Sequence, residues 1–258
     1  MERFLKKPSP DIHYFLPYIG VYETIYLIMN SELKRVGLLG GTFDPIHNGH
    51  LGLAAQTMQL FDLQKIVFIP VSQSPHKLHD RPTSSPHRVA MLELALEQET
   101  AFSIDLLEVE KGGVSYTIDT LSRLKENHPN WELFLILGAD AFLLMDTWKN
   151  YADILKLCHV LVSTRPGVKL ELPATLVQAL EIKEEIKNSP LEKNNLPITL
   201  NPVTGKTIRL YQIPTQDISS REIRLRVQAG KEIKNLLPPA VDHYIMRHRL
   251  YRSPPIMV

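Results

Sequence analysis

Cysteine is nearly absent from this sequence, which has a single one, Cys158, in 258 residues. An internal disulfide and a cysteine-rich zinc site are therefore excluded, and we expect a protein of the reducing cytoplasm. No run approaches the ~20 consecutive apolar residues of a membrane-spanning helix. Asp11, His13 and Glu23 interrupt the apolar patches near the start, so we expect no signal peptide.

The chain also lacks an excess of positive or negative charge. Lysine and arginine number 29, and aspartate and glutamate number 28. A balanced chain has no global field that would attract nucleic acid or an anionic membrane, so we expect neither as a partner. Any polyanionic ligand must be bound by a local site.

Short apolar segments alternate with helical patterns along the chain. The expected strands are residues 35–39, 65–70, 103–107, 133–137, 159–163 and 208–213. The expected helices are residues 49–61, 86–98, 117–127, 139–144 with 148–157, 220–228 and 238–248. Buried strands between amphipathic helices predict a single α/β domain, a Rossmann-like doubly wound parallel sheet with helices on both faces.

Two stretches depart from this alternation. Residues 1–33 contain no clear element and are interpreted as an N-terminal extension of a domain that spans residues 34–258, with Met29 as a candidate translation start. Residues 167–206 are interpreted as an insertion before the last strand. The insertion contains a charged, helix-like stretch at 174–187 and a turn that leads through 198–206 into a hairpin with that strand.

The most informative segment joins the first strand to the first helix, Gly40-Gly41-Thr42-Phe43-Asp44-Pro45-Ile46-His47-Asn48-Gly49-His50. Unpaired N–H groups and the dipole at a helix start favour phosphate, and glycines let the backbone approach it. The three-residue spacing places both imidazoles on one helix face at that end. Taken singly, a Gly-Gly turn and a pair of surface histidines remain alternatives, and the pair lacks the third ligand of a zinc site.

Together these residues resemble the signature of the nucleotidyltransferase superfamily, which includes class I aminoacyl-tRNA synthetases. The motif is most similar to that of bacterial nicotinate-nucleotide adenylyltransferases. The resemblance implies that His47 and His50 are catalytic. It also implies ATP-binding roles for Gly40, Gly41, Thr42 and Phe43.

A second motif is Ile218-Ser219-Ser220-Arg221-Glu222-Ile223-Arg224. Ser219 is a good N-cap, and Glu222 stands where a capping box requires it, so capping alone would explain the segment. It also resembles the family's C-terminal Ile-Ser-Ser-Thr-x-Ile-Arg motif, with Arg221 in place of threonine. That resemblance implies binding of the ATP phosphates by Ile218, Ser219, Ser220 and Arg224.

Further segments match the family in the same order along the chain. The resemblance implies that Gly138 and Asp140 contact the adenosine of ATP. It assigns the mononucleotide to Lys77, Thr117, Trp148 and Arg165. By itself, Lys77 would be a solvated loop lysine, Asp140 a helix cap and Trp148 a core side chain.

The resemblance implies transfer of AMP from ATP to nicotinate mononucleotide, a step of NAD biosynthesis that gives deamido-NAD and pyrophosphate. The attack would be in line without a covalent enzyme intermediate, and Mg²⁺ would be held mainly by substrate phosphates. A sibling reaction on nicotinamide mononucleotide or phosphopantetheine, or a cytidylyl transfer, is an alternative. A tRNA synthetase fragment is another, although the chain lacks a Lys-Met-Ser-Lys-Ser-like loop and a basic anticodon-binding domain. The oligomeric state and the strictness of the acceptor choice stay open.

Overall fold

The computed structural model describes residues 33–73, 82–164, 174–179, 198–200, 206–214 and 218–252. The chain divides into two units, residues 1–33 and residues 34–258. The described residues other than Leu33 belong to the second unit. Apart from Leu33, the predicted N-terminal extension therefore lies outside the described residues, as do Lys77, Arg165 and most of the predicted insertion.

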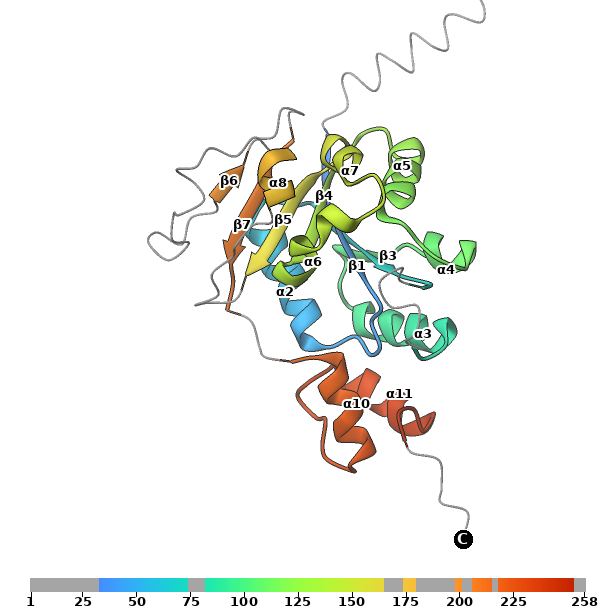
Figure 1. Cartoon of the computed structure of the whole chain (residues 1–258). Coiled ribbons are helices and arrows are strands. Elements are labelled where there is room, and N and C mark those ends of the chain that lie inside the picture. Colours follow the sequence, from blue (N-terminus) through green and yellow to red (C-terminus); the bar gives the residue numbers. More distant parts are fainter. Residues whose placement is uncertain are drawn as a thin grey trace, which may run out of the picture. The chain divides into compact units, whose positions relative to one another are not determined.

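A seven-stranded sheet is the centre of the second unit (Figure 1). Its strands are β1 (Lys34–Gly41), β2 (Lys65–Pro70), β3 (Phe102–Ile104), β4 (Trp131–Gly138), β5 (His159–Thr164), β6 (Ile198–Leu200) and β7 (Ile208–Gln212). The order is β3-β2-β1-β4-β5-β7-β6, and all neighbours are parallel except β6, which is antiparallel to β7. The order reverses between β1 and β4, and ligands bind at the carboxyl ends of the strands beside such a switch point.

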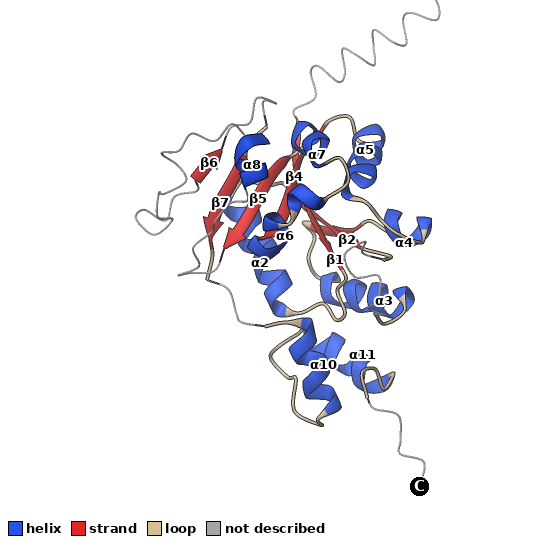
Figure 2. Ribbon diagram, in the orientation of Figure 1, coloured by secondary structure: helices blue, strands red, loops and turns tan. Residues whose placement is uncertain are grey.

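Helices cover both faces of this sheet (Figure 2). They are α2 (Asn48–Leu60), α3 (Ser85–Leu96), α4 (Leu107–Lys111), α5 (Thr117–Asn127), α6 (Ala139–Leu143), the 3-10 helix η2 (Met145–Thr147), α7 (Tyr151–Leu157), α8 (Ala174–Ala179), α10 (Ser220–Gln228) and α11 (Pro239–Arg247). One core joins the sheet to α2, α3, α10 and α11. The other joins it to α5, α6, α7 and α8, so the predicted doubly wound architecture is confirmed.

The predicted extent of the third strand, residues 103–107, is wrong. The observed strand β3 covers only Phe102–Ile104. The helix α4, which was not predicted, begins at Leu107. The Asp105 carboxylate accepts the Leu107 N–H at 2.9 Å, and this local bond turns the chain into the helix.

The predicted helix at 148–157 begins later than expected, at Tyr151. Asn150 adopts a left-handed conformation with φ of 51°, which interrupts the helix and leaves Trp148 in an extended link after η2. Of the predicted helix at 174–187, α8 covers Ala174–Ala179, and residues 180–187 lie outside the described part. The hairpin of β6 and β7 is confirmed. No helix in the described ranges is long and apolar enough to cross a membrane.

Candidate active site

Two histidine rings stack at the start of α2. His47 is the N-cap residue, in extended conformation, and His50 lies in the first turn. Their ring centroids are 3.7 Å apart and their planes differ by 24°. The predicted placement of both imidazoles on one side of the helix start is therefore confirmed.

Both histidines are neutral near pH 7. Burial lowers the pKa of His47 to about 4. Burial and the neighbouring His47 also hold the pKa of His50 well below 6.5. The Nδ1 atoms of both rings are buried without a hydrogen-bond partner. A neutral imidazole still has one N–H, so each ring can donate one hydrogen bond to an anion.

The loop between β1 and α2 is held by side chains from distant parts of the chain. The buried Arg88 of α3 donates to the carbonyls of Thr42 at 2.7 Å and Thr83 at 2.9 Å. The Asp44 carboxylate accepts the Thr83 N–H at 3.1 Å and the Tyr251 hydroxyl at 2.7 Å. Sequence reasoning missed these supporting groups, because no local pattern connects positions as distant as 44 and 251.

Phe43, a predicted ATP ligand, is buried, with only 2% of its surface exposed. Its ring packs edge-on against His50, with centroids 5.2 Å apart. Its backbone has φ of 49°, an uncommon conformation for a bulky residue, and the surrounding contacts hold it there. The structure therefore gives the Phe43 ring a role in supporting His50.

The start of α10 supplies the second predicted phosphate site. Ser219 Oγ accepts the Glu222 N–H at 3.1 Å, so the predicted N-cap is confirmed. The Glu222 carboxylate pairs with Arg226 one turn further on, at 2.9 Å. The cap leaves α10 with an ordered first turn.

The two helix starts lie against each other although they are far apart in the sequence. Ser220 Oγ donates to the Pro45 carbonyl at 2.9 Å, and Arg224 donates to the Asp44 carbonyl at 2.6 Å. A methyl group on Gly49 would lie 3.6 Å from the Ile218 carbonyl oxygen. In this structure Ser220 and Arg224 therefore fasten α10 to the histidine loop.

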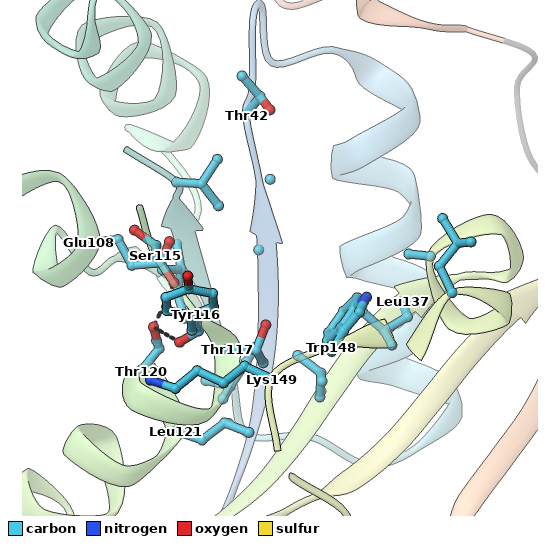
Figure 3. Close-up of a pocket in the computed structure, with 18 of the residues that line it drawn as sticks. Thr42, Glu108, Ser115, Tyr116, Thr117, Thr120, Leu121, Leu137, Trp148 and Lys149 are labelled. Atoms are coloured by element: carbon cyan, nitrogen blue, oxygen red, sulfur yellow. Dashed lines mark hydrogen bonds between the residues drawn. The ribbon is translucent and has the colours of Figure 1, made fainter. Parts of the chain in front are cut away.

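A cavity of about 490 Å³ opens at the carboxyl ends of β1 and β4 (Figure 3). The predicted site residues in its wall are Gly40, Gly41, Thr42, Thr117, Asp140 and Trp148. Gly138 ends β4 next to this wall. Among the described residues, the two histidines and residues 218–224 are not part of its lining.

The Trp148 indole and the buried polar groups lie on opposite sides of the cavity (Figure 3). Figure 3 shows Trp148 on one side and Glu108, Ser115 and Tyr116 on the other, with Thr117 between them. Lys149 Nζ pairs with Asp119 at 3.2 Å and lies 4.6 Å from the centre of the Tyr116 ring. Sequence reasoning missed Glu108 and Lys149, which belong to no motif that it used.

No group of three or more histidine, cysteine, aspartate or glutamate side chains that could hold a metal ion occurs within the described ranges. The carboxylate of Asp44, in the loop that leads to the histidines, accepts hydrogen bonds from Thr83 and Tyr251. The described residues therefore do not fit a magnesium ion held by the protein alone.

The cytidylyltransferase-like family matches residues 38–226 of this chain. The chain is 41% identical over 217 residues to a probable nicotinate-nucleotide adenylyltransferase of Geobacter sp. (strain M21), covering 84% of this chain and 98% of that protein. It is 39% identical over 224 residues to a protein of the same description from Desulfitobacterium hafniense (strain Y51), covering 87% and 99%.

The fold is similar to that of solved structures. Plasmodium falciparum nicotinic acid mononucleotide adenylyltransferase complexed with APC aligns with a TM-score of 0.61, at 22% identity, over 84% of this chain and 97% of that one. The same protein complexed with NaAD aligns equally well. At this level of identity the likeness supports the fold.

Proposed function

The chain belongs to the nicotinate-nucleotide adenylyltransferase family, and we infer that it transfers the adenylyl group of ATP to nicotinate mononucleotide, giving deamido-NAD and pyrophosphate. One observation supports this most strongly. Gly40, Gly41 and Thr42 line the cavity and lead directly into the loop that carries the stacked histidines. A ligand in the cavity would therefore lie beside a helix start suited to phosphate.

The nicotinate mononucleotide would occupy the cavity. Its volume is typical of small-molecule sites, and the Trp148 indole is suited to stack on a flat heteroaromatic ring. Thr117 is the first residue of α5, where unpaired backbone N–H groups favour a carboxylate. Lys77 and Arg165 remain predicted ligands of the mononucleotide.

ATP would lie across the ends of β1 and β4. Its phosphates would meet the amides of Gly40 and Gly41, the two histidines and the start of α10, with Ile218, Ser219, Ser220 and Arg224 as the predicted ligands. Its adenosine would lie near Gly138 and Asp140. Mg²⁺ would arrive with the ATP, held by phosphate oxygens and water.

The reaction needs no protein nucleophile. An oxygen of the acceptor's phosphate attacks the α-phosphorus, the bond from that phosphorus to the bridging oxygen breaks, and its electron pair leaves with pyrophosphate. The attacking phosphate is already an anion, so no base has to remove a proton. Catalysis then consists of alignment and of donors aimed at developing negative charge, which the N–H groups of His47 and His50 would supply.

The direct test measures pyrophosphate release with ATP and each candidate acceptor. We expect nicotinate mononucleotide to have the highest kcat/KM, by more than roughly tenfold over nicotinamide mononucleotide, because donors placed for a carboxylate stay unpaired with an amide. Phosphopantetheine, and CTP in place of ATP, should give no turnover. Equal efficiency on the acid and the amide would contradict a carboxylate-selective site. The predicted cytoplasmic location would be tested by fractionation.

A further inference from the structure

A buried polar cluster in the cavity wall has no role in the adenylyl transfer described above. It consists of Glu108 from α4, Thr120 from α5 and Ser115 from the segment between them. Their exposed fractions are 6%, 5% and 7%, and all three residues line the cavity. Figure 3 shows them on the side opposite Trp148.

One half of the Glu108 carboxyl group is satisfied and the other is not. Thr120 Oγ1 donates to Glu108 Oε1 at 2.6 Å. Glu108 Oε2 and Ser115 Oγ are both buried and meet no partner at hydrogen-bond geometry, although the Ser115 hydroxyl lies near enough to the Glu108 carboxyl group to affect its pKa. A buried polar atom without a partner is costly, and in a ligand cavity it is suited to meet a group that the ligand brings.

The surroundings of Glu108 favour its neutral form. Burial raises the pKa of Glu108, and the nearby Asp105 acts in the same direction. The hydroxyls of Thr120 and Ser115 and the charge of Lys111 lower that pKa without cancelling the effect of burial. Lys111 is itself paired with Asp119 at 3.5 Å, and Asp119 also holds Lys149. The charged groups of Lys111, Lys149 and Asp119 therefore form ion pairs with one another.

We propose that Glu108 determines the specificity of the acceptor cavity for anionic mononucleotides, by admitting the acceptor when the Glu108 carboxyl group carries its proton and repelling it when that group is ionised. The proposal rests on the proposed function, because nicotinate mononucleotide brings both a carboxylate and a phosphate. A protonated Oε2–H is a donor that an anion can accept from, whereas a buried ionised carboxylate in the cavity wall repels an anion.

The proposal has a thermodynamic signature. An anion that prefers protonated Glu108 must draw a proton onto the protein as it binds, at any pH above the pKa of Glu108 in the free protein. The logarithm of the Kd then rises with pH by up to about one unit per pH unit in that window. A purely structural role, in which Glu108 only anchors Thr120, produces no such dependence.

The experiment is calorimetric titration of the full chain with nicotinate mononucleotide, without ATP, between pH 5.5 and 8.5. Two buffers of different ionisation enthalpy at each pH give the number of protons taken up. The variants are Glu108→Gln, which keeps an acceptor for Thr120 and has a permanent N–H donor, and Glu110→Gln. Glu110 is exposed on the same helix and serves as the matched control.

We expect the wild type and Glu110→Gln to bind more weakly as the pH rises and to take up a proton. Glu108→Gln should lose this dependence, apart from the part due to the ligand's own phosphate, and at pH 8 should bind at least about fivefold more tightly than the wild type. Equal pH dependence in wild type and Glu108→Gln overturns the proposal, as does a folded Glu108→Gln protein that no longer binds.

If Glu108→Gln does not fold, proton uptake by the wild type with two different ligands tests the proposal. It should take up more protons with nicotinate mononucleotide than with ribose 5-phosphate, which carries the same phosphate but no ring carboxylate. Equal uptake overturns the proposal. Failure of the proposed function looks different, because the wild type would then neither bind nicotinate mononucleotide nor release pyrophosphate with it at any pH, and both inferences would fall together.

Discussion

At the scale of single residues, His47 and His50 combine two properties that usually exclude each other. His47 is buried, His50 is partly buried and their rings stack, which keeps both neutral, yet they lie at a helix start, which favours anions. Neutral imidazoles do not repel each other in the free protein. A bound phosphate would raise both pKa values by its charge and strengthen the hydrogen bonds that it receives.

His50→Ala should reduce turnover by at least ~10²-fold, because preorganised donors to a developing charge are worth that much. Turnover is measured by pyrophosphate release, and the fold is checked by thermal unfolding. His243→Ala, on the exposed side of α11, is the control and should keep wild-type turnover. A folded His50→Ala protein with near-normal turnover would contradict the proposed chemistry.

Burial of His47 also makes stability depend on pH. In the unfolded chain the imidazole binds a proton below its ordinary pKa of 6.5, whereas the folded protein binds it only near pH 4. The contribution of the neutral His47 imidazole to the free energy of unfolding is therefore fully present above pH 6.5, and it is lost as the pH falls toward 4. The loss amounts to about 2 kcal/mol at pH 5.

The measurement for His47 is the free energy of unfolding in urea at pH 7 and pH 5. His47→Gln should lose less stability on acidification than the wild type, by about 2 kcal/mol. The contribution of His50 remains in both proteins, and His243→Gln should behave as the wild type. The same acid loss in His47→Gln would show that His47 is not the titrating group.

At the scale of elements, the first turn of α2 contains a glycine, Gly49, that lies against the His47 ring. A Cβ on Gly49 would lie 3.0 Å from both Cε1 and Nδ1 of His47, which is closer than real Cβ atoms usually approach. On Gly52, in the next turn, a Cβ would approach nothing closer than the end of the Gln56 side chain, at 3.8 Å. A side chain at position 49 would therefore crowd the His47 ring, whereas position 52 on the same helix has room for one.

Gly49→Ala should therefore lower turnover by about tenfold or more, by displacing the His47 ring, while the helix itself gains from alanine. Gly52→Ala, the matched control, should keep wild-type turnover and gain about 0.5–1 kcal/mol of stability. Both variants are compared by pyrophosphate release and by urea unfolding. Equal turnover in the two variants would show that the His47 position tolerates the displacement.

At the scale of the whole molecule, long-range contacts assemble the site. The strand order places β1 beside β4, so residues 40–42 and Asp140 share one cavity. Contacts from α3, α10 and Tyr251 then fix the histidine loop. All of these groups lie within residues 34–252.

We expect residues 1–28 to be dispensable. A chain of residues 29–258 should fold, melt within a few degrees of the full chain and keep its turnover, because packing of the apolar patches in the first segment would affect only stability, by ~1.5–3 kcal/mol for each large side chain. Both chains are compared by thermal unfolding and pyrophosphate release. An insoluble or inactive shorter chain would assign the segment to the enzyme.

Features that depend on neighbours along the chain could be predicted before the structure was known. The buried runs and amphipathic stretches predicted the doubly wound sheet, and the spacing of His47 and His50 placed both rings at one helix start. Features that depend on contacts between distant residues could not be predicted, such as the hydrogen bond from Tyr251 to Asp44 and the burial of Glu108. Side-chain burial and long-range hydrogen bonds arise when the layers pack, and burial is what shifts the pKa values of His47 and Glu108.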